Sequence, residues 1–552
     1  MLRFRILMLR TLAALVLAAV IQAQPADKRA DVDRLFSAFN THTPGCSVGV
    51  AQNGIVILKA GYGMADLERN VPITSDTIFE SGSVAKQFTA AAVMLLAQQG
   101  KISLDDPLRK YLPELADYGA PVTIRQVLSH ISGLREWRPL ATFGGRPEDS
   151  YVYTNQDILQ MASQQRGLNF DPGTAYTYSN TGFNLFPTLI ERALANGESF
   201  ETFTRENIFA PLGMEHTRWR ADFRAIVPNR ALAYTHPEGA SGWTQDTPIE
   251  NIIGAGGMLT TVSDLLLWNE NFTHAKVGGP EFVKAQQTPA TLSGGRQIPY
   301  AAGLSINTVN GLREVSHGGA TGGYRTWLGR YPDQAVSVVV LCNSGAANPQ
   351  KLGRDTASLW TGAAAAGKTK AEAYTADPAK LEALAGMYRR LRDNTVVRIK
   401  WHEGKLTSER SNTALVPVSA GKFLAGGTET EVQFDDGPPV RMRMITQIDE
   451  VLYQRVEPVQ PTPAELATLA GEYESRETGT TLKLAPGAKP GEMTYQIGSN
   501  APVTLRPTFR DAFETPSGSS IYFIRDAAGK VVALSAGEDR VWDLRFTRIR
   551  KT

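Results

Sequence analysis

The sequence predicts an α/β domain followed by two small antiparallel β domains. Three observations support this fold class. Apolar, strand-like runs stand at both ends of the region 46–345, with segments of helix and loop between them. After residue 374 the sequence changes to short alternating runs separated by turn residues, and this second part contains an internal repeat. Strands that flank a helical region place both ends of the first domain in one shared sheet.

Turn signals mark the strands of the first domain. The stretch "CSVGVAQNGIVILKAGYGMADLE" holds two apolar runs around Asn53-Gly54, the strongest short signal for a β-hairpin. At the other end, "REVSHGGA", "YRTWLGRYP" and "AVSVVVLCNSG" predict three successive strands. The stretch "GAAAAGKTKAEAY", 362–374, is typical of a helix tail or linker with little to bury.

The second part of the chain repeats itself. "PAKLEALAGMY" begins at Pro378, and "PAELATLAGEY" begins 85 residues later at Pro463. The match continues at the same offset, where Thr395 precedes "VVRI" and Thr480 precedes "TLKL". Glycine and tyrosine in register make a chance similarity of two Ala/Leu-rich helices a poor explanation. We therefore expect two copies of one small barrel-like β domain, each opened by a short helix.

The first residues are typical of an export signal. Arginines in "MLRFRILMLR" precede the apolar run "TLAALVLAAVI", which is shorter than the roughly 20 residues of a membrane-spanning helix. Cleavage after Ala23 would leave a periplasmic or secreted protein without a membrane span; an uncleaved amphipathic anchor is the alternative. The predicted units are a signal peptide at 1–23, an α/β domain at 24–365 and β domains at 371–460 and 461–552.

Composition narrows the possible functions. A chain of 552 residues with 42% hydrophobic and 20% charged residues is a globular protein of several domains. A formal net charge of +2 and the absence of a long basic tract give no basis for binding nucleic acid. The seven histidines show no spacing typical of a metal site. We expect no metal and no cofactor.

Ser83 and Lys86, in "ESGSVAKQF", form the first candidate catalytic pair. Apolar residues from Val84 to Leu96 cover most of a helix that Gly100 can end. Ser83 stands at the start of this helix, where the dipole favours developing negative charge, and Lys86 shares its face. Burial should depress the pKa of Lys86, and a serine hydroxyl needs such a neighbour to become a nucleophile. S-x-x-K alone is nevertheless a weak signal.

Two further segments could complete a site. "AYTYSNTGF" offers the phenol of Tyr178 and the amide of Asn180, two residues apart. "VSHGGATGG" offers His317 on a predicted strand, followed by two glycines that would let a substrate approach the backbone.

These three segments, in this order, resemble the S-x-x-K, Y-x-N and K/H-x-G motifs of the serine β-lactamase and penicillin-recognising hydrolase superfamily. The similarity is to the branch that contains class C β-lactamases, D,D-carboxypeptidases, related esterases and D-aminopeptidases. It covers about 40–350 and includes the scaffold-like segments "DDPLRKYLPEL", "TIRQVLSHISGL", "IFAPLGMEHT" and "GAGGMLTTVSDL". The resemblance implies a β-lactamase-like fold, an antiparallel sheet flanked by helices.

The resemblance also implies a role for each matching residue. Ser83 would be the acylated nucleophile, and Lys86 and Tyr178 would move its proton. Asn180 would hold Lys86 or the substrate amide. The oxyanion hole would consist of the backbone N–H groups of Ser83 and of Ala320, which follows His317 and Gly319; two such donors contribute several kcal/mol in the transition state.

His317 stands where K-T-G is the commoner form of the third motif. A histidine, with an ordinary pKa of about 6.5, is mostly neutral at pH 7 and suits a substrate carboxylate less well than a lysine. This favours esters, amides or peptides bound from the amino end. A catalytic domain followed by two β-barrels is also the layout of the D-aminopeptidases, in which a C-terminal domain reaches over the active site. The stretch 485–500 is our candidate for such a reaching loop.

We therefore expect a serine hydrolase that acts through an acyl-enzyme on a small peptide, amide or ester, D-residue peptides first. Carboxylesterase, β-lactamase and D,D-carboxypeptidase activities are alternatives on the same fold. A penicillin-binding protein that is acylated without turnover and an idle domain that binds cell wall are alternatives of another class. The sequence leaves the oligomeric state open.

Several other residues attract attention. Ser47 in "GCSVG" matches the G-x-S-x-G elbow, but a polar segment precedes it and a strand follows, so a structural role is expected. His130 in "LSHISG" is expected to be a hydrogen-bonded structural histidine, and Trp268 a core residue. Arg325 and Glu136 could line the cleft, and surface or structural ion-pair roles are the alternatives.

Cys46 and Cys342 are the only cysteines. Two separate buried thiols are the default expectation. In the β-lactamase-like fold, however, the first strand pairs with the last, and antiparallel pairing would place Cys46 beside Cys342. A disulfide between them is the alternative hypothesis.

Overall fold

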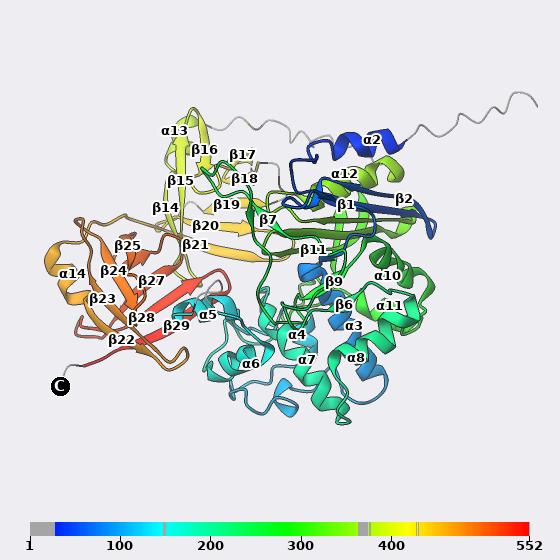
Figure 1. Ribbon diagram of the computed structural model, residues 1–552. Coiled ribbons are helices and arrows are strands. Elements are labelled where there is room, and N and C mark those ends of the chain that lie inside the picture. Colours follow the sequence, from blue (N-terminus) through cyan, green and yellow to red (C-terminus); the bar gives the residue numbers. More distant parts are fainter. Residues whose placement is uncertain are drawn as a thin grey trace, which may run out of the picture.

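The computed structural model describes residues 28–550 apart from 147–150, 363–373, 375–376, 427, 429 and 436. An α/β domain and two closed β-barrels make up these residues (Figure 1). The α/β fold followed by two antiparallel barrel domains is confirmed. The predicted signal peptide at 1–23 and almost all of the predicted linker lie outside the described residues.

A six-stranded antiparallel sheet forms the centre of the α/β domain. Its order, β10-β11-β12-β13-β1-β2, places the first strand next to the last, as the sequence predicts. Asn53 and Gly54 both adopt positive φ angles in the predicted hairpin between β1 and β2. The strands are β1 (Cys46–Gln52), β2 (Ile55–Tyr62), β10 (Ser305–Val309), β11 (Leu312–Thr321), β12 (Tyr324–Tyr331) and β13 (Val336–Cys342).

Helices cover both faces of this sheet (Figure 1). α2 (Lys28–Leu35) and α12 (Pro349–Thr361) lie on one face and bury Val32, Phe36 and Ala357 against it. The other face carries the larger helical region. Its helices are α3 (Lys86–Gln98), α4 (Ile124–Leu128), α5 (Trp137–Phe143), α6 (Asn155–Gln164), α7 (Asn180–Leu194), α8 (Phe200–Thr204), α9 (Ala210–Leu212), α10 (Val262–His274) and α11 (Pro280–Gln286).

Helix α3 runs through the middle of this helical region. Every residue from Lys86 to Leu96 is buried, as expected for a helix whose sequence is apolar nearly all round. Trp268 of α10 packs on Phe88 and is fully buried, so its predicted core role is confirmed. Two strand pairs, β3-β4 and β7-β8, and a three-stranded sheet, β5-β9-β6, lie between the helices. These short strands are β3 (Met64–Asp66), β4 (Val71–Pro72), β5 (Phe79–Glu80), β6 (Arg218–Trp219), β7 (Tyr234–Thr235), β8 (Thr244–Gln245) and β9 (Met258–Thr260).

Each C-terminal repeat is a short helix followed by a closed barrel of eight antiparallel strands. The first repeat consists of α13 (Pro378–Glu382) with β14 (Gly386–Arg390), β15 (Val396–His402), β16 (Lys405–Ser408), β17 (Ala414–Ser419), β18 (Lys422–Ala425), β19 (Glu431–Asp435), β20 (Arg441–Ile445) and β21 (Glu450–Val456). The second consists of α14 (Pro463–Leu469) with β22 (Gly471–Ser475), β23 (Thr480–Pro486), β24 (Met493–Ile497), β25 (Val503–Pro507), β26 (Ala512–Glu514), β27 (Ser520–Arg525), β28 (Val531–Glu538) and β29 (Val541–Arg548).

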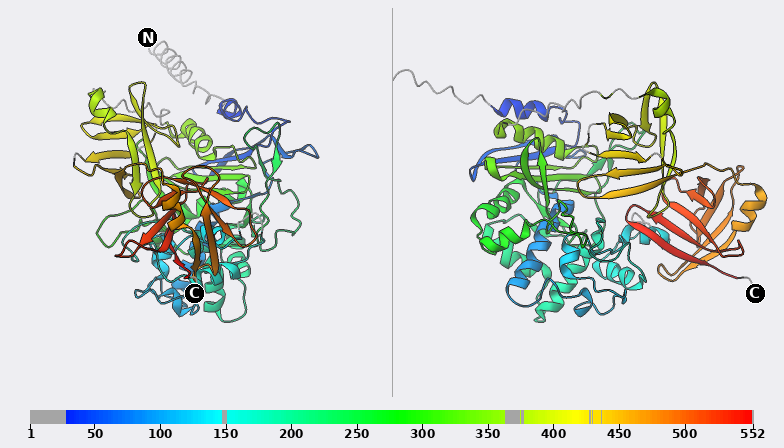
Figure 2. Two further views of the ribbon diagram at one scale, coloured as in Figure 1. Left: turned by 90° about the vertical axis from the view of Figure 1, so that its left-hand side faces the viewer. Right: turned by 180° about the vertical axis from the view of Figure 1, so that it is seen from behind.

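The repeated residues play the same part in both barrels. The Tyr388 hydroxyl donates to the Leu384 carbonyl, and the Tyr473 hydroxyl donates to the Leu469 carbonyl, each at 2.7 Å. The second barrel also packs on the α/β domain, because Phe143 of α5 joins the barrel's core and contacts Phe546. Figure 2 shows this barrel beside the α5 end of the domain.

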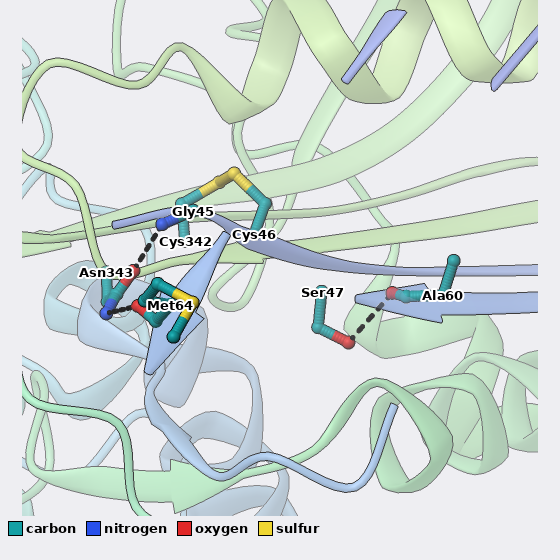
Figure 3. Close-up of a disulfide and its surroundings, with 7 residues drawn as sticks. All are labelled: Gly45, Cys46, Ser47, Ala60, Met64, Cys342 and Asn343. Atoms are coloured by element: carbon teal, nitrogen blue, oxygen red, sulfur yellow. Dashed lines mark hydrogen bonds between the residues drawn. A yellow bond between two sulfur atoms is a disulfide. The ribbon is translucent and has the colours of Figure 1, made fainter. Parts of the chain in front are cut away.

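Cys46 and Cys342 form a disulfide (Figure 3). They are directly opposite each other in the β1–β13 pairing, and their Cα atoms lie 4.0 Å apart. The default expectation of two separate thiols is therefore wrong, because antiparallel pairing brings the start of β1 to the end of β13. Ser47, the next residue, donates from its hydroxyl to the Ala60 carbonyl within the sheet, so its structural role is confirmed (Figure 3).

Within the described residues, no helix combines the length and the apolar character that crossing a membrane requires.

Candidate active site

A cavity of about 900 Å³ opens where β11, the start of α3 and the loop before α7 meet. The structure brings all the predicted site residues together here. Lys86 is fully buried just beneath the cavity wall. The other predicted residues line it: Ser83, Tyr178, Asn180, His317, Gly319 and Ala320.

Ser83 belongs to a 3₁₀ turn, η1 (Gly82–Ala85), that leads directly into α3. Gly82 has φ +50°, and a Cβ there would lie 2.7 Å from the Ala320 nitrogen. A Cβ on Gly319 would lie 2.1 Å from the Ser81 carbonyl oxygen. Both glycines therefore allow β11 to run directly against η1. The main chains of Ser83 and Ala320, whose N–H groups are the predicted oxyanion donors, consequently lie side by side at the cavity.

The Lys86 amine touches three oxygen atoms. Its Nζ lies 2.7 Å from Asn180 Oδ1, 2.8 Å from the Ala255 carbonyl oxygen and 3.0 Å from Ser83 Oγ. The first two oxygens can only accept a hydrogen bond, whereas a hydroxyl can also donate one. A neutral Lys86 amine must therefore give both of its N–H groups to Asn180 and Ala255. Its lone pair then points at the Ser83 hydroxyl.

The surroundings of Lys86 favour that neutral form. Burial lowers the pKa of the Lys86 amine well below its usual value of 10.5. The charge of Glu136 works against this shift, and the charges of Arg138 and Arg540 add to it. An amine with a depressed pKa and a lone pair aimed at a hydroxyl has the properties of a general base.

Tyr178 is hydrogen-bonded to Ser83, and its ring contacts Lys86, His130 and Arg540. Lys86 Nζ lies 4.8 Å from the centre of the Tyr178 ring, and the His130 ring packs on it at 4.2 Å between centres. Burial raises the pKa of the Tyr178 phenol well above its usual value, while a hydrogen bond with Ser83 and the charge of Arg540 lower it. The phenol is therefore protonated at neutral pH and available as a proton donor.

Glu136 holds Asn180 in place. The Asn180 main-chain N–H donates to Glu136 Oε2 at 2.5 Å, and its side-chain Nδ2 donates to Oε1 at 2.8 Å. This double contact fixes the amide so that Oδ1 faces Lys86. Glu136 is only 2% exposed, so a surface role is excluded. It is a buried positioning residue that also pairs with Arg138 at 3.9 Å, in line with the ion-pair alternative. Arg325, the other open residue, lines the cavity.

A chain of hydrogen bonds fixes His317 in a neutral tautomer. The Ser179 N–H donates to His130 Nδ1, so the His130 proton is on Nε2, 3.2 Å from the Tyr300 hydroxyl. Tyr300 then donates to His317 Nε2 at 2.9 Å. His317 keeps its proton on Nδ1, 2.6 Å from the Gly318 carbonyl oxygen. His130 is thus a hydrogen-bonded structural residue, as predicted, and His317 carries no charge.

This buried histidine predicts a pH dependence of stability. Burial, helped by the charge of Lys86, lowers the pKa of His317 from 6.5 to about 4. Between these values the unfolded chain binds a proton on this residue that the folded chain does not. The contribution of His317 to the free energy of unfolding is therefore complete above the unfolded pKa. It is lost as the pH falls through the folded pKa, by on the order of 3 kcal/mol in total.

Denaturant unfolding of wild type and His317→Asn between pH 7 and 4.5 measures this effect. We expect a shallower fall in the free energy of unfolding for the variant, which has lost the titrating group. His42→Asn, at an exposed histidine, serves as the control and should follow wild type. Equal slopes for His317→Asn and wild type would contradict the neutral assignment.

The second barrel also contributes to the cavity. The two-residue turn between β28 and β29 places Arg540 on the cavity wall, with its guanidinium carbon 5.0 Å from the centre of the Tyr178 ring. The stretch 485–500, expected to be the reaching loop, belongs to β23, β24 and their connections, and none of it lines the cavity. That prediction is wrong. The stretch contacts the α/β domain near its end, where Asn500 Nδ2 donates to the Gly145 carbonyl and the Ile497 side chain lies next to Gly145.

Within the described ranges, no three His, Cys, Asp or Glu side chains gather in a way that could hold a metal ion.

Comparisons with known proteins agree with this geometry. The beta-lactamase family model matches residues 32–359. A D-aminopeptidase from Gluconobacter oxydans (strain 621H) is 28% identical over 526 residues, which cover 92% of this chain and 96% of that protein. Penicillin-binding protein 4* from Bacillus subtilis (strain 168) is 28% identical over 334 residues, which cover 57% of this chain and 72% of that protein.

Two solved structures share the fold. The octameric penicillin-binding protein homologue from Pyrococcus abyssi has a TM-score of 0.56 and 23% identity, and the match covers 77% of this chain and 98% of that chain. The crystal structure of SurE has a TM-score of 0.51 and 21% identity, and the match covers 94% of this chain and 98% of that chain.

Proposed function

The chain belongs to the beta-lactamase family, and from this premise we propose that it hydrolyses peptide or amide bonds through an acyl-enzyme on Ser83. One observation carries the proposal: of the three oxygen atoms that contact the Lys86 amine in the described part of the chain, the Ser83 hydroxyl is the one to which it can direct its lone pair. A serine hydroxyl becomes a useful nucleophile when such a base takes its proton.

Acylation then runs as follows. Ser83 Oγ attacks the substrate carbonyl carbon while its proton moves to Lys86 Nζ. The carbonyl oxygen becomes an oxyanion and accepts hydrogen bonds from the main-chain N–H groups of Ser83 and Ala320. Tyr178 donates its phenolic proton to the leaving nitrogen, the C–N bond breaks, and Lys86 returns a proton to Tyr178.

Deacylation reverses these proton transfers. A water molecule takes the place of the leaving amine beside Tyr178 and attacks the ester carbon. Its proton passes through Tyr178 and Lys86 to Ser83 Oγ as the ester bond breaks. Asn180, held by Glu136, keeps the Lys86 amine in position through both steps.

We propose D-residue peptides or amides as the first substrate class. The support is the similarity to a D-aminopeptidase over 92% of this chain, together with a third motif that carries no positive charge. A second candidate is a β-lactamase or D,D-carboxypeptidase activity on substrates with a carboxylate. It is favoured by the three arginines that line the cavity, Arg138, Arg325 and Arg540.

Hydrolysis of D-alanine p-nitroanilide, compared with its N-acetylated form, distinguishes these candidates, with Ser83→Ala as the blank. A D-aminopeptidase-like enzyme releases p-nitroaniline faster from the free amine, because acetylation removes the charged group that such an enzyme recognises. Equal rates on both, or activity on neither, would contradict the aminopeptidase assignment. Esters and β-lactams would then be the substrates to test.

We also propose that the protein is exported. The support is the arginine-rich and apolar start of the sequence and the Cys46–Cys342 disulfide, because disulfides persist in oxidising compartments. Protein recovered from the periplasm of producing cells should begin at Gln24 and contain no free thiol. A chain that retains Met1 in the cytoplasm would contradict export.

A further inference from the structure

The turn that carries Arg540 is held firmly against the α/β domain. The Arg540 carbonyl oxygen accepts from Asn169 Nδ2 at 2.9 Å and from the Glu136 N–H at 3.3 Å. The Trp542 N–H donates to Asn169 Oδ1 at 3.0 Å. Asn169 therefore binds the main chain at Arg540 and again at Trp542, two residues later. All of these contacts use the main chain of the turn, so they fix its position whatever side chain it carries.

The first barrel holds the same turn from the other side. Asp539 Oδ1 accepts from Arg390 Nη1 at 2.8 Å and from Arg392 Nη2 at 3.2 Å. Arg392 also lies over the Trp542 ring at 4.7 Å. Contacts from both barrels thus fix the position of this two-residue turn at the active site. Asp539, the neighbour of Arg540, already pairs with Arg390 and Arg392.

The Arg540 side chain points at Tyr178 and at no acid. Among the described residues, its guanidinium has no carboxylate within 4.0 Å, and its guanidinium carbon stands 5.0 Å from the centre of the Tyr178 ring. A cation over an aromatic ring is attracted by the ring's electrons, and the attraction grows when the ring carries a negative charge.

In the described part of the α/β domain, the permanent cation closest in effect, Arg138, lies over the Trp137 ring and pairs with Glu136 and Glu250. His317 faces Tyr178 with ring centres 6.3 Å apart, but its hydrogen bonds keep it neutral. Lys86 must lose its positive charge to act as the base. Among the described residues, the permanent cation that lies over the Tyr178 ring itself, Arg540, therefore comes from the second barrel.

We propose that Arg540 is a positioning residue of this active site: its guanidinium holds the Tyr178 ring and stabilises negative charge on the phenolic oxygen while Tyr178 passes its proton to the leaving group. The inference rests on the proposed function, because it assumes that Lys86 and Tyr178 move the proton of Ser83. It gives the two barrels a part in catalysis in addition to any part in substrate selection.

Several charged and titratable groups face Tyr178 from the elements around it. They are Lys86 of α3, His130 after α4, Glu136 and Arg138 at the start of α5, Tyr176 of the loop before α7 that also holds Tyr178, Tyr300 before β10, His317 of β11 and Arg540 of the β28–β29 turn. Arg540 lowers the pKa of both the Lys86 amine and the Tyr178 phenol. Removing its charge raises both, so the base form of Lys86 is reached only at higher pH.

The pH profile of kcat/KM tests the proposal, measured with p-nitrophenyl acetate, a neutral ester that offers no anion for an arginine to bind. Between pH 5 and 9 we expect Arg540→Gln to move the acidic limb upward by about one pH unit, with a loss of about tenfold or more at pH 6 and a smaller, constant loss on the plateau at high pH, where the phenolic oxygen still lacks its cation. Arg540→Lys, which keeps the charge, should restore most of the activity at pH 6.

Arg545→Gln is the matched control, because Arg545 is an exposed arginine of β29 that pairs with Asp543. Thermal unfolding of every variant shows whether the barrel remains docked.

A uniform loss of kcat/KM at all pH values with an unmoved acidic limb would overturn the proposal and leave Arg540 a structural residue. A loss confined to substrates with a carboxylate, with the neutral ester unaffected, would overturn it and make Arg540 a substrate contact. Turnover that Ser83→Ala does not reduce would instead overturn the proposed function itself.

Discussion

Ser83→Ala is expected to reduce turnover of any ester or amide substrate by roughly 10⁴-fold or more, because the attacking oxygen, which lies 3.0 Å from the Lys86 amine, is lost. KM should change little for substrates whose binding depends on the rest of the cavity. The measurement is kcat with p-nitrophenyl acetate and with D-alanine p-nitroanilide, at equal protein concentration.

Ser47→Ala is the matched control for this variant. Ser47 lies in the G-x-S-x-G pattern, but its hydroxyl is buried in the sheet and donates to the Ala60 carbonyl. It should keep activity close to wild type. If Ser47→Ala abolishes turnover while Ser83→Ala retains it, the assignment of the nucleophile is wrong.

Lys86→Met is expected to lower kcat/KM by about 10²–10⁴-fold, the usual contribution of a general base. Methionine fills much of the buried space, but it cannot accept the Ser83 proton, and it leaves Asn180 Oδ1 and the Ala255 carbonyl without their shared donor. The acidic limb of the pH profile should disappear, because the titrating amine has gone.

Lys101→Met provides the comparison at an exposed lysine beyond the end of α3 and should leave both the rate and the pH profile unchanged. Thermal unfolding of Lys86→Met separates a catalytic loss from a folding defect. Retention of the acidic limb in a well-folded Lys86→Met protein would show that another group is the base.

Much of the fold follows from local signals. Asn53-Gly54 predicts the β1–β2 hairpin because both residues tolerate positive φ angles, and the 85-residue repeat predicts two copies of one barrel. The site motifs are equally local. Ser83 and Lys86 share a turn of helix, and Tyr178 and Asn180 are two residues apart, so spacing alone predicts their proximity.

The rest of the site depends on contacts between distant segments. Glu136, Tyr300 and Arg540 belong to no short motif, and their partners lie 44, 17 and more than 300 residues away along the chain. The segment of the C-terminal domain that reaches the active site is the clearest example of a feature that the sequence does not reveal. The Gly- and Pro-rich stretch 485–500 has the composition of a loop, whereas the actual element is a two-residue hairpin turn whose composition gives no signal.

The same limit applies to the two cysteines. Residue types alone allow two buried thiols or a disulfide, and the choice depends on the register of two strands that are separated by 296 residues. Likewise, the neutral state of His317 depends on Tyr300 and His130, which the sequence does not place beside it.

Mass spectrometry of the acylated protein tests the central claim most directly. The protein would be mixed with the p-nitrophenyl ester of D-phenylalanine, quenched in acid within the first turnovers and digested. We expect the D-phenylalanyl group as an ester on the peptide that contains Ser83, and its absence from Ser83→Ala treated in the same way. Turnover with the acyl group on another residue, or turnover that continues in Ser83→Ala, would contradict the mechanism.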